Sequence, residues 1–275
     1  MAAPRRDHRG IVDAADLLAR VRFRRHEPAA ALRPYLEHYW LIDWDLPQPY
    51  ASHVVPHPSV NVVFQRSGGD EHGEVAGIGL GLFTQKLEGV GRVCGVQFRP
   101  GGFRPFAPQA PVAEWTGRRL PLGEVFEGLR EDPEVLASVL GPDDDAGRVA
   151  ALDTFLLARG PRPDPQADLA MALVERIRGD RTILRAGALA RDEGLALRTL
   201  QRLFAQYVGV GPKWVILRYR IHEALERAES DAQVRWAELA AELGYTDQAH
   251  LVRDFTATVG VPPTAYAQPR GADRG

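Results

Sequence analysis

The chain has 275 residues, of which 45% are hydrophobic and 25% charged, a composition typical of globular proteins and not of fibrous or disordered ones. This length exceeds that of one ordinary domain, so we expect two. The formal net charge of -2 at pH 7 indicates neither a nucleic acid nor a membrane as partner.

The N-terminal segment is basic but lacks the apolar core of a secretion signal, and no window approaches the length of a membrane span. We therefore expect a cytoplasmic protein with no membrane partner. Cys94 is the only cysteine, which excludes internal disulfides and cysteine-cluster zinc sites. Its position between Val93 and Gly95 in an expected strand favours an inert core residue over a reactive sensor.

The first half of the chain is predicted to be rich in β-strands. Short aromatic or β-branched runs occur at 35–46, 59–65 and 92–98, separated by Pro and Gly clusters. This pattern indicates a β-barrel or a sandwich. Helical segments bounded by Pro, Gly or Asp are expected at 121–129, 133–140 and 147–158. Residues 1–160 thus form a predicted β-rich domain with a helical C-terminal part.

Candidate ligand-binding residues in this half are few. Trp40 lies on an alternating run and could line a pocket or fill a β core. Arg99 and Arg104 flank two glycines in FRPGGFRPF, which indicates either a tight loop or an anion-binding loop.

Metal and enzyme sites have little support in the sequence. Four histidines could suggest a metal site, but the usual cupin spacing of two histidines one residue apart is absent. They are His38, His53, His57 and His72. We expect no metal and no cofactor, and the absence of nucleophile-elbow, Walker and Rossmann signatures predicts that the chain is not an enzyme. The alternative from another class is a cupin-like metal-binding enzyme or sensor that uses the helical half for targeting.

Three prolines within five residues mark the expected boundary, and residues 161–167 are predicted to be a semi-rigid linker. From 168 to 268 the pattern is helical and repeats itself. A shift of 51 residues superposes five pairs of landmarks. They are Leu200 on Leu251, Arg202 on Arg253, Phe204 on Phe255, Gly209 on Gly260 and Pro212 on Pro263.

Each copy has a Leu-Ala pair on a first helix, a Gly at its end, a short turn, and a second helix with Leu and Phe four residues apart. This pattern predicts two helix-turn-helix units, at about 181–210 and 234–262. A polar stripe on one such helix could simply face solvent, but two copies with matching Gly and Pro positions favour recognition helices. On their open faces, Arg can contact guanine, Gln adenine, and Val a thymine methyl group.

The two copies differ in charge. Residues 181–221 hold eight basic and two acidic residues, a net charge of +6, whereas residues 222–275 hold five basic and nine acidic, a net charge of -4. The first copy is therefore expected to attract the phosphate backbone. The second is expected to bind DNA more weakly and to contact another partner, either RNA polymerase or the N-terminal domain. A single helix at 212–230 is predicted between them; its nineteen residues would span about 28 Å, close to the roughly 34 Å between successive major grooves.

The segments LARDEGLALRTLQRLFAQYVGVGPKW (189–214) and LAAELGYTDQAHLVRDFTATVGVPPTAY (239–266) resemble the two halves of the AraC-type DNA-binding domain. The resemblance implies a sequence-specific transcription regulator, with double-stranded DNA as partner and gene activation as its expected mode. The first half also resembles the β-rich domain that precedes such domains in one subgroup. This resemblance implies that residues 1–160 are a cupin-like sensor or dimerisation domain, with a small-molecule effector or a homodimer as its expected partner.

The family's base-contacting positions correspond to residues on the second helix of each copy. The candidate DNA-binding residues are Arg198, Thr199, Gln201, Arg202, Gln248, Ala249, Val252 and Arg253. One departure is Ala196, where the family usually has a serine that caps the first recognition helix. Asp247 can cap the second, and His250 in its first turn is expected to make a backbone or core hydrogen bond in preference to a base contact.

Overall fold

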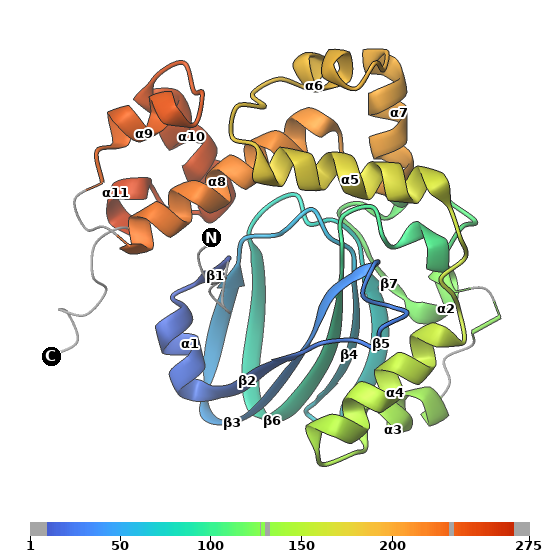
Figure 1. Cartoon of the computed structure of the whole chain (residues 1–275). Coiled ribbons are helices and arrows are strands. Elements are labelled where there is room, and N and C mark those ends of the chain that lie inside the picture. Colours follow the sequence, from blue (N-terminus) through green and yellow to red (C-terminus); the bar gives the residue numbers. More distant parts are fainter. Residues whose placement is uncertain (1–9, 127, 130–132, 231–233, 267–275) are drawn as a thin grey trace, which may run out of the picture.

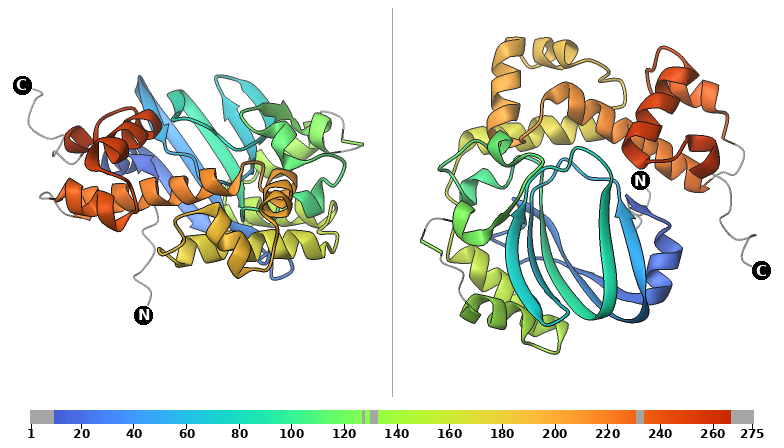
Figure 2. Two further views of the ribbon diagram at one scale, coloured as in Figure 1. Left: turned by 90° about the horizontal axis from the view of Figure 1, so that it is seen from above. Right: turned by 180° about the vertical axis from the view of Figure 1, so that it is seen from behind.

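The computed structural model describes residues 10–126, 128–129, 133–230 and 234–266. A strongly curved β-sheet comes first, and the later helices lie along its back and across one end (Figures 1 and 2). The predicted α+β class, with a β-rich first part and a helical second part, is confirmed.

The sheet is antiparallel and has seven strands in the described residues, in the order β1-β3-β6-β4-β5-β7, with β2 also paired to β3. One continuous sheet agrees with the barrel-like prediction and not with a two-sheet sandwich. The strands are β1 Ile11–Val12, β2 Val21–His26, β3 Leu36–Val54, β4 Asn61–Ser67, β5 Asp70–Ala76, β6 Phe83–Phe98 and β7 Arg119–Pro121. A short helix, α1 Ala14–Arg20, joins β1 to β2.

The sequence alternation of β3 assigns its side chains to opposite faces of the sheet. Tyr39 and Leu41 are fully buried on the back face, in the main core. Trp40 and Trp44 point to the concave face, where they belong to a smaller apolar cluster. The sheet therefore separates two apolar environments, one under the helices and one inside its curve.

Short helices follow the sheet and cover its back. They are η1 Arg104–Phe106, η2 Val112–Trp115, α2 Leu122–Val125, α3 Pro133–Leu140 and α4 Asp145–Leu157. An ion cluster ties α4 to the sheet. Asp43 on β3 accepts hydrogen bonds from Arg148 at 3.0 Å, from Arg92 at 2.9 Å and from Arg24 at 2.6 Å, and Asp145 accepts a further bond from Arg24.

The second half is helical. It consists of α5 Pro165–Gly179, α6 Ala186–Asp192, α7 Leu197–Tyr207, α8 Pro212–Ser230, α9 Trp236–Glu242, α10 Gln248–Val259 and α11 Pro263–Tyr266. Asp164 caps α5 by accepting from the backbone N of Gln166 at 3.0 Å, and Pro165 occupies the first helical position, which it favours. Residues 165–167 of the predicted linker are thus the first turn of α5.

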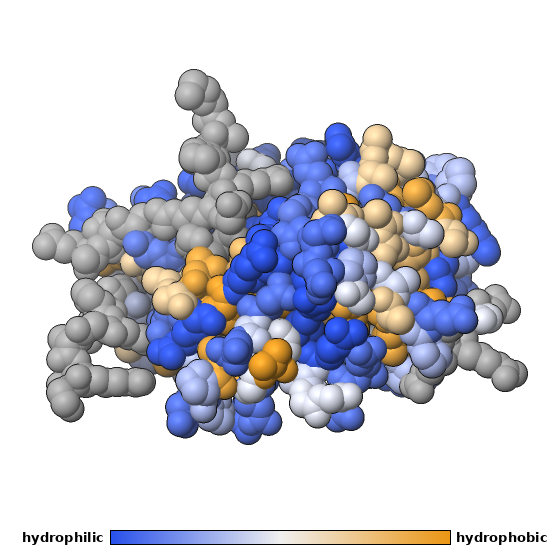
Figure 3. Space-filling model, turned by 90° about the horizontal axis from the view of Figure 1, so that it is seen from below, coloured by the Kyte–Doolittle hydropathy of each residue, from blue (hydrophilic) through white to orange (hydrophobic). Residues whose placement is uncertain are grey.

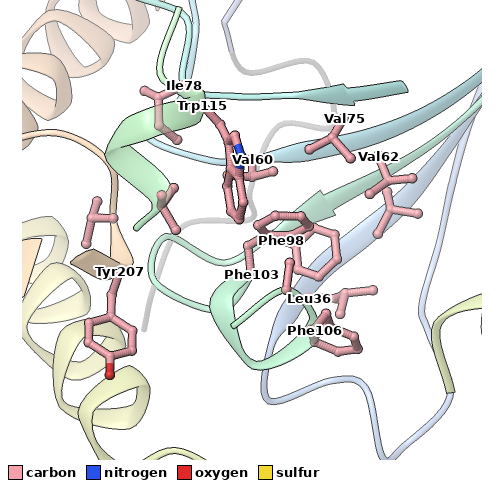
Figure 4. Close-up of a cluster of buried hydrophobic side chains, with 14 of the residues drawn as sticks. Leu36, Val60, Val62, Val75, Ile78, Phe98, Phe103, Phe106, Trp115 and Tyr207 are labelled. Carbon is pink, nitrogen blue, oxygen red and sulfur yellow. The ribbon is translucent and has the colours of Figure 1, made fainter. Parts of the chain in front are cut away.

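The largest hydrophobic cluster runs through both halves of the chain. Figure 4 shows its aromatic centre around Phe98, Phe103 and Trp115, with Tyr207 of α7 beside it. Thr116 donates a hydrogen bond to the carbonyl oxygen of Gly209, just after α7, at 2.8 Å. The first helix-turn-helix unit therefore packs directly on the N-terminal half. The division into 1–160, 161–167 and 168–268 stays a prediction.

None of the helices that the structure describes is long and apolar enough to cross a membrane. On the face seen from below, hydrophilic residues and apolar patches are interspersed (Figure 3).

Candidate DNA-binding surface

The first helix-turn-helix unit is formed by α6 and α7. The turn between them depends on Gly194, whose φ of 66° lies in the left-handed region that glycine tolerates best. The N–H of Leu195 returns to the carbonyl of Ala190 at 2.8 Å, closing the end of α6. Leu200 and Phe204 of α7 are fully buried, so the opposite face of this helix is the exposed one.

That open face carries the predicted residues of the first unit. Arg198, Thr199, Gln201 and Arg202 are all exposed. Within the described residues, no hydrogen bond or ion pair engages the side chain of Arg198 or Arg202. By contrast, Arg178 on α5 is paired with Glu37 at 2.9 Å. The two guanidinium groups of α7 are therefore available to an outside ligand.

The second unit, α9 and α10, repeats this geometry. Gly244 has a φ of 71°, and the N–H of Tyr245 bonds to the carbonyl of Ala240 at 2.9 Å. Leu251 and Phe255 are fully buried. Gln248, Ala249 and Arg253 are exposed and Val252 is half-buried, so one open face presents the four predicted residues of this unit.

The helix caps follow the expectations from the sequence. Asp247 accepts a hydrogen bond from the backbone N of His250 at 2.7 Å, whereas Ala196 offers no side chain to α7. The imidazole of His250 packs edge-on against Tyr245 and lies 3.8 Å from a carboxylate oxygen of Asp254. These contacts support a structural role for His250.

The missing cap gives a testable difference between the units. Ala196→Ser is expected to raise the free energy of unfolding by about 1 kcal/mol, because the serine hydroxyl would accept a hydrogen bond from an unpaired backbone N–H at the start of α7. The matched variant, Asp247→Ala, removes the cap of α10 and is expected to lower the free energy of unfolding by about 1 kcal/mol. Urea unfolding of both variants checks this, and an unchanged midpoint for Ala196→Ser would contradict the capping argument.

The helix α8 spans residues 212–230 as predicted, but its cations do not all face outward. Arg218 is 4% exposed; its guanidinium lies 4.4 Å from the centre of the Trp214 ring and donates to the carbonyl of Leu80 at 3.1 Å. Burial lowers the pKa of Arg218 to about 10. Arg181 is paired with Glu223 at 3.0 Å. Arg218 is thus unavailable to DNA, which makes the exposed charge of the first unit smaller than the sequence count.

The same helix contacts the N-terminal half through His222, which the sequence analysis did not single out. The ring of His222 is 2% exposed and stacks on that of His57, with centroids 4.1 Å apart and planes 8° from parallel. His222 Nε2 also lies 3.2 Å from the carbonyl oxygen of Pro56. Because His57 and His222 lie far apart in the sequence, no local sequence pattern could predict their contact.

The three candidate ligand residues lie in different places. Trp40 lines a cavity on the concave face of the sheet. Arg99 and Arg104 do not line this cavity. Arg99 donates a hydrogen bond to the carbonyl oxygen of Leu36 at 3.3 Å, and Arg104 donates one to the Tyr207 hydroxyl at 3.1 Å. Both arginines thus hold parts of the fold together.

The remaining chemical candidates are accounted for by packing. Cys94 is fully buried, and burial raises the pKa of its thiol to about 11, so it is not a nucleophile at neutral pH. Of the histidines, His38 and His57 line the cavity, and His53 pairs with the Thr84 hydroxyl at 2.9 Å. In the described part of the chain, no three His, Cys, Asp or Glu side chains form a group able to hold a metal ion.

Comparisons with known proteins agree with this geometry. Residues 24–121 match a family described as a domain of unknown function (DUF6597), and residues 189–269 match a helix-turn-helix domain. No curated protein matches the chain. Among solved structures, ToxT from Vibrio cholerae bound to an unsaturated fatty acid is 13% identical; the match covers 88% of this chain and 96% of ToxT, with a TM-score of 0.45. The C-terminal domain of AraT, a response regulator from Geobacillus stearothermophilus, is 21% identical over 38% of this chain and 93% of its own, with a TM-score of 0.32.

The helix-turn-helix match, together with two open recognition helices, defines a DNA-binding transcription regulator. Its C-terminal helix-turn-helix domain is of the AraC type, which confirms the resemblance found in the sequence. The alternative, a metal enzyme with a targeting domain, is not favoured.

Proposed function

We propose that the regulator binds one operator with both helix-turn-helix units, α7 and α10 each entering a major groove. The observation that carries this proposal is the arrangement around α8. Figures 1 and 2 show α6 and α7 at one end of this helix and α9 and α10 at the other. The nineteen residues of α8 span about 28 Å, close to the roughly 34 Å that separates successive major grooves on one DNA face.

The exposed residues give each unit its own base preference. Arg198 and Arg202 carry forked donors that match guanine, and Gln201 matches adenine. In the second unit, Gln248 and Arg253 provide the same chemistry, while Ala249 and Val252 offer apolar contact to a thymine methyl group. Thr199 can donate to either a base or a phosphate.

The N-terminal domain supplies control in this proposal, and no reaction is assigned to either half. Its sheet encloses a cavity suited to a small-molecule effector, and α8 touches the rim of that cavity through His222 and His57. The acidic second unit offers a surface for RNA polymerase, which fits an activator. A homodimer would form through the N-terminal domain.

Replacing one recognition residue tests the base-reading role. Arg202→Ala is expected to cost about 1–3 kcal/mol of binding to the preferred sequence and to relax preference at one base pair. Fluorescence anisotropy on duplexes with single base changes measures both effects.

A control places the same substitution elsewhere. Arg227→Ala removes a half-exposed cation of α8 that lies 3.6 Å from Glu242, and it is expected to leave the preference unchanged. Equal weakening of Arg202→Ala on every duplex would instead make Arg202 a phosphate contact.

A further inference from the structure

The concave face of the sheet holds a cavity of about 250 Å³, slightly below the roughly 300–1,000 Å³ of sites for drug-sized molecules. Its walls come from all seven strands that the structure describes in the sheet, from Leu17 of α1 and from the loops around Pro56 and Gly77. None of the residues that read DNA takes part in it. A ligand that fits this volume would be small.

Strand register orders the walls from a polar end to an apolar end. At one end Asn61, Gln97 and His38 lie side by side across β4, β6 and β3. One row further along, Arg25 on β2 pairs with Trp40. The next rows are mainly apolar: Phe23 lies beside Ile42 and Val93, with Gln65 of β4 as a polar neighbour, and Trp44 follows one row further on. Such a cavity matches a molecule with one polar head and one apolar body.

The apolar body of the ligand has to be planar where it contacts Trp40 and Trp44 of β3. Trp40 and Trp44 are paired with Gly95 and Gly91 on β6. A Cβ atom at either glycine would overlap the indole ring opposite it, so the glycines let both rings lie down on the neighbouring strand. Both indole rings also line the cavity. Aromatic faces favour offset stacking with a planar ligand.

The charged side chains that line the cavity determine which head group of a ligand can bind. Among the described residues that line the cavity, none is an Asp or Glu, whereas Arg25, Arg119, His38 and His57 are basic. Arg119 is neutralised by Glu74. Arg25 has its guanidinium 5.3 Å from the centre of the Phe23 ring and stands at the polar end. A guanidinium fork binds a carboxylate through two parallel hydrogen bonds.

We propose that this cavity binds a small planar aromatic carboxylate, with its ring system on Trp40 and Trp44 and its carboxylate toward Arg25 and His38. One consequence of this inference rests on the proposed function: that the bound ligand acts as the effector. His57 lines the cavity and stacks on His222 of α8, so occupancy can reach the helix that carries both helix-turn-helix units.

Isothermal titration of the full chain with 2-naphthoate tests the site directly. We expect one molecule bound per chain. We also expect binding at least about tenfold weaker for 2-naphthamide, which lacks the charge, and for decanoate, which lacks the ring. No binding of 2-naphthoate up to millimolar concentration, or tighter binding of decanoate, would overturn the proposal.

Two variants assign the contacts. Arg25→Gln is expected to weaken 2-naphthoate at least about tenfold and leave 2-naphthamide unchanged, so the amide also reports that the cavity is still folded. Trp40→Leu is expected to weaken both aromatic probes. Arg33→Gln, an exposed arginine outside the cavity, is the matched control. If Arg25→Gln binds 2-naphthoate like the wild type, the head-group assignment is wrong.

Operator affinity measured with and without 2-naphthoate separates the two proposals. Binding of 2-naphthoate without any effect on operator affinity would refute the effector role and leave the site standing. Operator binding without any 2-naphthoate binding would refute the site and leave DNA recognition standing.

Discussion

Reversing the charge of both arginines on α7, as Arg198→Glu with Arg202→Glu, is expected to abolish specific operator binding. Each side chain contributes about 1–3 kcal/mol if it contacts a base, and each new carboxylate would also repel the phosphate backbone. We therefore expect the dissociation constant to rise at least about a hundredfold. Neither arginine has a partner among the described residues, so the double variant should fold normally.

A matched reversal separates this local effect from a change in net charge. Arg33 and Lys86 are exposed on the N-terminal half and form only exposed ion pairs, with Glu27 and Glu88. Arg33→Glu with Lys86→Glu changes the net charge by the same amount and is expected to leave specific binding within a few-fold of wild type. Operator binding retained by the α7 double variant would show that Arg198 and Arg202 do not read the operator.

Removing the charge of Asp43 is expected to cause the largest loss of stability. Asp43 faces three guanidinium groups, one of them on Arg148, which is 1% exposed. Replacing Asp43 with asparagine leaves these cations without their shared carboxylate. Breaking a fully buried ion pair costs about 3–5 kcal/mol, and because the Asp43 side chain is 25% exposed we expect a loss at or below the lower end of that range. Urea unfolding measures the loss. Asp45→Asn, an exposed aspartate two residues along the same strand, is the control and should change little.

The same cluster sets a pH dependence. Burial raises the pKa of Asp43, but hydrogen bonds from Arg148 and Arg24 outweigh it and hold the pKa below its usual value. A hydrogen bond from Arg24 likewise holds the pKa of Asp145 well below its usual value. Because these folded-state pKa values are depressed, their stabilisation is present above about pH 4 and is lost as the pH falls further. Asp43→Asn should therefore show a shallower loss of stability below pH 4 than the wild type, and equal slopes would contradict the account.

Local patterns predicted the helical half well. The helix at 212–230 begins at a proline and has the predicted ends, and the two turns follow from Gly194 and Gly244. Such features depend on residues a few positions apart, where capping and turn preferences act directly. The open faces of α7 and α10 followed from helical periodicity in the same way.

Long-range contacts could not be predicted from the sequence. Asp43 and Arg148 lie 105 positions apart, and nothing near either one marks it as paired. Arg218 was counted among the cations for DNA, but the packing of α8 against Leu80 buries it. The first half of β6, FTQKLEGV (83–90), mixes polar and apolar residues and was not predicted to be a strand, although its pairing with β3 builds part of the cavity wall.

The most direct test of the central claim is selection of bound fragments from a random-sequence duplex library by the full chain, repeated at two salt concentrations. The account predicts a motif with two halves about one helical turn apart, because α8 holds two reading helices at that spacing. A single short half-site would mean that only the first unit reads bases. Recovery of no motif, with affinity collapsing as salt rises, would leave only non-specific phosphate binding and contradict operator recognition.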